Sequence, residues 1–108
     1  MDIDELIMKR DRDIAAAALY SHELPHIAVP PRKETFESLD NDTTGLWVVC
    51  RKGEYLITYD DVRQQYGLAF RNIIGDLVYL GEEGGIDDAY DSLVSRDDEQ
   101  GKKESRRR

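Results

Sequence analysis

The sequence predicts a small α+β domain in which an antiparallel sheet, built on a β-hairpin, packs against an N-terminal and a C-terminal helix. Residues 46–59 contain two runs of β-branched and aromatic residues on either side of a Lys52-Gly53 dipeptide. Apolar residues recur at helical spacing in residues 3–20 and 86–95. The length of 108 residues suits one domain. We therefore expect residues 1–96 to form one globular unit.

The hairpin is the clearest element. A two-residue turn at Lys52-Gly53 is expected because glycine supplies the positive φ that such turns need. This turn predicts a register that pairs Arg51 with Glu54. Both faces of the resulting hairpin are largely apolar, so both need cover. We therefore expect a third strand at residues 76–80 and at least one packed helix.

Both terminal helices have an apolar face. The first carries carboxylates in its opening turn, where the helix dipole favours them. Its inward positions are expected to be Ile3, Leu6, Ile7, Ile14 and Ala17/Ala18. For the last helix the inward positions are Ile86, Ala89, Tyr90, Leu93 and Val94.

The segments between these elements carry weaker signals. Residues 21–44 are expected to be a connection, extended at Pro30-Pro31, with a helical turn near Thr35–Leu39. Short helices are predicted at residues 60–66 and 68–74, because Gly67 and Gly75 follow them. Residues 82–85 are expected to be a flexible acidic loop. Residues 97–108 are charged and lack apolar residues, which predicts a disordered tail.

Composition restricts the cellular setting. The chain has no long apolar run, so no membrane span is expected. The start Met1-Asp2-Ile3-Asp4-Glu5 lacks the basic and apolar segments of a secretory signal. A single cysteine cannot form an internal disulfide. These observations predict a cytoplasmic protein.

No residue pattern predicts a metal or cofactor. His22 and His26 have helical spacing for zinc, but Pro25 lies between them and no third ligand is near. The segment 40–45 resembles the start of a calcium loop, but Arg51 stands where the closing carboxylate would be. We therefore expect no cofactor and read these segments as ordinary loops.

No residue pattern predicts catalysis either. Cys50 lies on an apolar face of the hairpin, where a cysteine usually acts as a small hydrophobe. Gly84-Gly85 lacks the further glycines and the lysine of a phosphate loop. The sequence therefore favours a binding protein over an enzyme.

The charge distribution is the feature of the sequence that indicates a function. The formal net charge is -8, although residues 102–108 contain five cations and one carboxylate. Such an acidic body repels nucleic acid and anionic membranes and attracts basic partners. The acidity has two alternative explanations, which are solubility and adaptation to a salt-rich source.

Between Asp60 and Asp91 the carboxylates outnumber the two arginines by six. We expect these carboxylates to form the partner-binding site: Asp60, Asp61, Asp76, Glu82, Glu83, Asp87, Asp88 and Asp91. A surface of this kind can imitate a phosphate backbone and occupy the basic cleft of a nuclease. Helix capping is the alternative explanation for several of them.

These observations predict a stoichiometric inhibitor of a basic protein. It would be an immunity protein (an antitoxin) against a bacterial toxin such as a nuclease, or a phage-type inhibitor of a defence complex. The alternative is an adaptor or regulatory subunit that pairs through an edge of the hairpin sheet. The sequence leaves the identity of the partner and the oligomeric state open.

Overall fold

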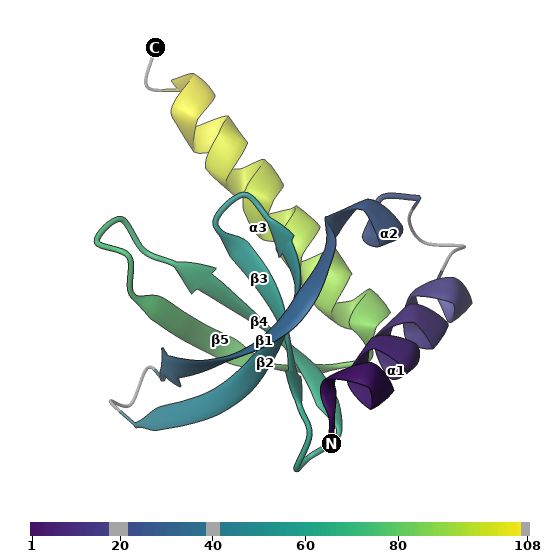
Figure 1. Ribbon diagram of the computed structural model, residues 1–108. Helices are drawn as coiled ribbons and strands as arrows, with labels where there is room; N and C mark the ends of the chain where they lie inside the picture. The colour runs from purple at the N-terminus through teal and green to yellow at the C-terminus, as the bar shows by residue number, and fades with distance from the viewer. Residues whose placement is uncertain (18–21, 39–41, 107–108) are drawn as a thin grey trace.

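The computed structural model describes residues 1–17, 22–38 and 42–106, and within these ranges the side chains as far as Asp97. The α+β class is confirmed: a five-stranded sheet packs against an N-terminal and a C-terminal helix (Figure 1). The elements in chain order are α1 Ile3–Ala16, α2 Leu24–Ile27, β1 Ala28–Glu37, β2 Thr43–Lys52, β3 Tyr55–Asp60, β4 Gln65–Arg71, β5 Leu77–Gly84 and α3 Ile86–Arg106.

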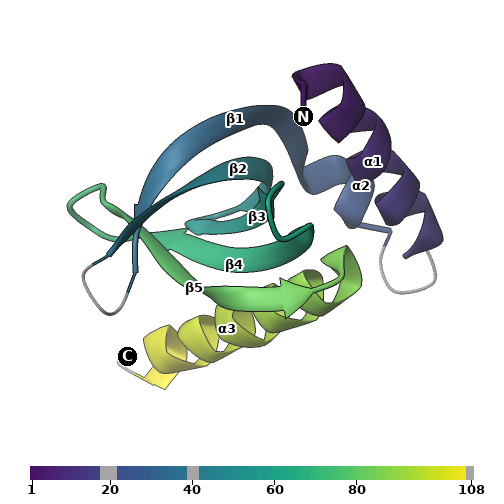
Figure 2. The same cartoon turned by 90° about the horizontal axis from the view of Figure 1, so that it is seen from below.

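The sheet is a meander that closes into a barrel. Each strand is antiparallel to the next, in the order β1-β2-β3-β4-β5. Closure is parallel, because the first and last of five alternating strands run the same way, and it rests on the single pair Glu37 with Val78. Figure 2 shows β1 arching away from β5 on one side of this contact. The strand predicted at 76–80 corresponds to the first half of β5, which begins at Leu77 and continues to Gly84.

The predicted hairpin is present as β2 and β3, but its predicted register is wrong. The turn is Gly53-Glu54, so that Lys52 pairs with Tyr55, and an irregularity between Val48 and Cys50 shifts the pairing further along. Gly53 has a φ of 59° at the first central position of the turn rather than the second. Glycine at the first position is the preference of type II′ turns.

The predicted helices at 60–66 and 68–74 are wrong, because this segment consists of the end of β3, the β3–β4 turn, strand β4 and the start of the β4–β5 loop. Gly67 marks a close strand contact and not a helix end: a Cβ there would lie 2.6 Å from the Tyr79 hydroxyl. Gln64, with a φ of 56°, closes the β3–β4 turn instead. Ile73 and Ile74, which fall in the predicted 68–74 helix, are exposed in the β4–β5 loop.

Two further segments that were expected to be a helical turn and a loop belong to strands. The region around Thr35 is not a helical turn but part of β1, in which Phe36 is buried. Glu82 and Glu83 lie in β5, which continues to Gly84, and not in a loop. In both segments the strand is fixed by pairing with a distant neighbour, which local composition does not report.

The core has two parts, one on each side of the sheet, so the expected cover on both faces is confirmed. The outer part joins the helices to the convex face of the barrel. It includes Leu6, Ile14, Leu24, Val49, Ile57, Leu68, Ile86 and Leu93. The inner part fills the barrel with Phe36, Leu46, Val48, Leu56 and Ala69.

The terminal helices differ from expectation at their ends. α1 ends at Ala16 with Ala17 as its cap, and the rest of the predicted 3–20 helix lies outside the described residues. Ile3, expected to face inward, is exposed. The backbone of α3 continues to Arg106, through most of the stretch where a disordered tail was expected. No helix in the described ranges is both long and apolar enough to cross a membrane.

Candidate partner-binding surface

Seven of the eight predicted carboxylates come together at one end of the barrel. The antiparallel register pairs Tyr66 with Gly84, which brings the β3–β4 turn beside the end of β5 and the start of α3. This register gathers Asp60, Asp61, Glu82, Glu83, Asp87 and Asp88, with Asp91 one turn further along α3. The eighth, Asp76, precedes β5 and therefore lies at the opposite end of that strand.

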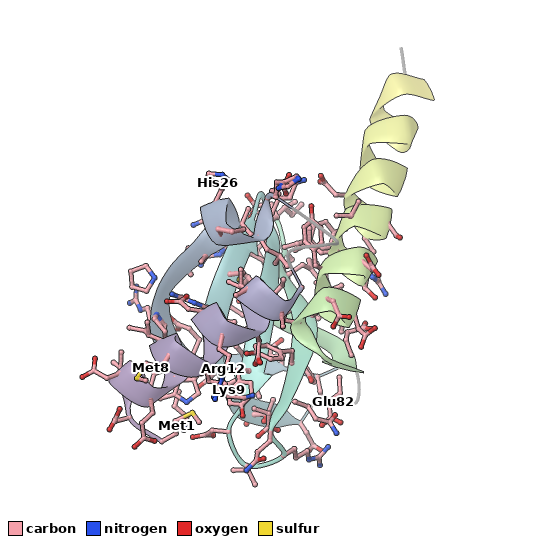
Figure 3. All side chains as sticks on the ribbon, turned by 90° about the vertical axis from the view of Figure 1, so that its right-hand side faces the viewer. Met1, Met8, Lys9, Arg12, His26 and Glu82 are labelled. Atoms are coloured by element: carbon pink, nitrogen blue, oxygen red, sulfur yellow. The ribbon has the colours of Figure 1, made fainter. Side chains whose placement is uncertain are left out.

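The first turn of α1 adds carboxylates that the sequence analysis did not assign to the site. The amino group of Met1 lies 4.0 Å from the Asp61 carboxylate. Figure 3 shows Met1, which precedes α1, and Lys9 of α1 low on the molecule, at about the level of Glu82. We call this surface the acidic end. It consists of the seven carboxylates above together with Asp2, Asp4 and Glu5.

Several carboxylates of the acidic end have structural partners. Asp60 accepts hydrogen bonds from the backbone N–H groups of Val62 (2.9 Å) and Arg63 (3.1 Å), and so closes the β3–β4 turn. Glu82 forms an ion pair with Arg63 at 2.6 Å. Asp88 accepts from the Gly85 N–H at 3.2 Å and caps α3. Local structure accounts for these three side chains without a partner protein.

The remaining carboxylates are available for binding. Within the described residues, Glu83, Asp87 and Asp91 make no side-chain hydrogen bond or ion pair. Asp87 and Asp91 are four apart on α3 and therefore lie on the same face of the helix. Among the seven predicted carboxylates of the acidic end, these three are the ones that local structure does not explain.

A pocket of about 360 Å³ lies where α1, the β3–β4 turn and the start of α3 meet. The Tyr66 hydroxyl donates to Asp13 at 2.7 Å, and Lys9 donates to the same carboxylate at 3.0 Å. Lys9 also lies 5.5 Å from the centre of the Tyr59 ring. Burial, and then the hydrogen bond to Asp13, raise the pKa of Tyr66, so its hydroxyl stays protonated and donates. These contacts fix α1 against the barrel.

The cysteine and the two histidines singled out in the sequence lie in different surroundings. Cys50 is fully buried, and burial raises the pKa of its thiol to about 12, so it is not an activated nucleophile. His22 and His26 are both exposed around the short helix α2. No group of three or more His, Cys, Asp or Glu side chains is placed to hold a metal in the part of the chain that the structure describes.

The segment compared with a calcium loop falls partly outside the described residues. Residues 40 and 41 lie there, whereas Thr43–Gly45 begin β2. Arg51 is also in β2. The segment therefore leads into a strand, as an ordinary turn does.

Comparison of the chain with protein-family models, curated proteins and solved structures found no match in any of the three.

Proposed function

We propose that this protein is a stoichiometric inhibitor that binds a basic partner protein through its acidic end. The partner would be a bacterial toxin such as a nuclease, which makes this chain an immunity protein, or a nucleic-acid-binding defence complex, which makes it a phage-type inhibitor. The proposal rests on the way the fold brings carboxylates from separate parts of the chain together. Carboxylates from α1, the β3–β4 turn, β5 and α3 meet on one surface although they are far apart in sequence.

The electrostatics of such a surface suit this function. Clustered carboxylates present to a basic cleft the kind of charge that a phosphate backbone presents. Opposite charges steer two proteins together and raise the association rate. Glu83, Asp87 and Asp91 make no side-chain hydrogen bond or ion pair within the described residues, so their charges are free to meet cations of a partner.

The alternative function, pairing through an edge of the hairpin, has less support. β2 lies between β1 and β3, and β3 lies between β2 and β4. Each hairpin strand therefore has a neighbour on both sides, and neither offers a free edge for β-strand addition.

The test compares two charge-reversed variants that change the net charge equally. The first, Glu83→Lys/Asp87→Lys/Asp91→Lys, alters the unpartnered carboxylates of the acidic end. The matched control, Glu37→Lys/Glu54→Lys/Asp76→Lys, alters exposed carboxylates away from it. Glu54 and Asp60 lie at opposite ends of β3, roughly 20 Å apart at the usual rise per residue. Asp2, Asp4 and Glu5 are unsuitable as a control because they belong to the acidic end.

The partner is captured from source cells with the unmodified protein, and association rates are then measured against ionic strength. We expect the first variant to associate about tenfold more slowly at low salt, because steering is lost. The difference should shrink as salt screens the charges. The control should associate at nearly the parent rate. Equal slowing of both variants, or salt-independent rates for all three proteins, would refute the proposal. The acidity would then serve solubility alone.

A further inference from the structure

A second pocket opens at the other end of the barrel. It has a volume of about 310 Å³. Its walls are the first half of β1, the end of β4 and the start of β5, with parts of β2 and β3 beneath. Closure between β1 and β5 rests on Glu37 and Val78 alone, so the part of β1 before Thr35 has no β5 partner. The interior of the barrel is therefore open there. Mouths of β-barrels are common positions for small-molecule sites.

The strand register turns three arginines toward this opening. Arg51 pairs with Leu56, and Arg32 pairs with Val48. Directly paired residues share a face of the sheet, and both partners belong to the inner core. Arg71 follows Ala69 of the inner core by two residues and so lies on the same face. All three arginines line the pocket.

The charge at this opening is not balanced. Arg32 forms an ion pair with Glu34 at 2.9 Å. Arg51 donates only to the Gly53 carbonyl, at 3.2 Å, and Arg71 has no carboxylate partner among the described residues. Two unpaired guanidinium groups thus border one pocket in a chain whose net charge is -8. The floor beneath them is apolar and is formed by Val48, Leu56 and Leu77.

Protection of the open edge does not require these arginines. Inward-facing charges are one way to stop a strand edge from pairing with another chain. However, the open stretch of β1 contains Pro30 and Pro31, which have no N–H group to offer. The prolines already block this edge, so edge protection does not account for the arginines.

We propose that this mouth binds a small organic anion with an apolar body, such as a medium-chain carboxylate. The carboxylate would accept hydrogen bonds from Arg51 and Arg71, whose fork of donors matches it, and the chain would cover the apolar floor. The size of the pocket, at the lower limit for small-molecule sites, suits a ligand of this class. This site is independent of the acidic end.

The test is calorimetric titration of the full chain with octanoate. We expect saturable binding at one site, and weaker binding of octanol, which lacks the charge. The variant Arg51→Gln/Arg71→Gln should lose affinity by about tenfold or more, because hydrogen bonds to charged groups are lost. The matched control Arg12→Gln/Arg63→Gln removes two cations elsewhere and should bind octanoate as the parent does.

A third variant, Leu77→Trp, fills the apolar floor and leaves the arginines in place. We expect it to fold, since Leu77 is only half-buried, and to lose octanoate binding. The proposal is overturned if octanoate does not saturate, if the control weakens as much as the double variant, or if only sedimentation with anionic phosphatidylserine vesicles depends on Arg51 and Arg71. That last result would assign the arginines to a membrane surface.

Discussion

At the scale of single residues, Arg10 is the main departure from the sequence analysis. It lies on the inward face of α1, four residues from both Leu6 and Ile14, and only 7% of its surface is exposed. Its guanidinium donates to the backbone carbonyls of Val29 in β1 and Val49 in β2. The helical periodicity alone would place a hydrophobic residue at this position. Instead, a charged side chain joins α1 to two strands.

Replacing Arg10 with methionine should lower the free energy of unfolding by about 2 kcal/mol. The apolar stem is kept, but the carbonyls of Val29 and Val49 lose a charged donor and Asp11 loses its ion-pair partner. Urea unfolding of this variant and of Arg12→Met, at an exposed position of the same helix, provides the comparison. Equal stability of the two variants would show that the Arg10 hydrogen bonds make no net contribution to the free energy of unfolding.

At the scale of elements, α3 consists of two unlike halves. Its first half packs Ile86, Ala89 and Leu93 into the outer core, with Val94 against the same cluster. From Ser95 onward the sequence has no apolar residue and ends in basic residues. Burial of an apolar face supplies most of the stability of a protein helix, so the second half has little to hold it in place.

Removing residues 97–108 should therefore change the free energy of unfolding by less than about 0.5 kcal/mol, as for changes away from the core. The helical circular dichroism signal should fall, because α3 becomes shorter. As a contrast, truncation after Ser92 also removes Leu93 and Val94 and should cost about 2 kcal/mol or more, since a buried leucine is lost. A marked drop in melting temperature for the first truncation would mean that the end of α3 packs on the domain.

At the scale of the whole molecule, charge is divided between the two ends of the barrel. The acidic end gathers carboxylates from four elements, whereas the mouth is bordered by Arg32, Arg51 and Arg71. Like charges held close together repel one another and destabilise the folded state, and salt screens this repulsion. The clustering therefore has a measurable thermodynamic consequence that does not depend on any partner.

Raising sodium chloride from about 10 mM to about 300 mM should increase the melting temperature, because the Debye length shrinks over this range. The variant Glu83→Gln/Asp87→Asn/Asp91→Asn should show a smaller increase than the parent. The control Glu37→Gln/Glu54→Gln/Asp76→Asn should retain most of the increase, because its carboxylates lie outside the acidic end. The same salt response in both variants would indicate that repulsion is spread evenly over the surface.

The sequence by itself determined the α+β class, the two terminal helices, the presence of the hairpin and the strand at 76–80. Each of these depends on a periodic pattern or a turn residue within one short segment, such as the inward series from Ile86 to Val94. The carboxylates of the expected site were also visible as a cluster in sequence, because all eight lie between Asp60 and Asp91.

The tertiary structure alone decided that Gln65–Arg71 is a strand, that Gly53 begins its turn, and that α1 brings Asp2, Asp4 and Glu5 to the acidic end. It also separated Asp76 from the other carboxylates and turned Arg51 and Arg71 toward the barrel mouth. Strand pairing and barrel closure join residues distant in the chain. Their free energy comes from contacts that exist only when the whole sheet has formed, so no local pattern reports them.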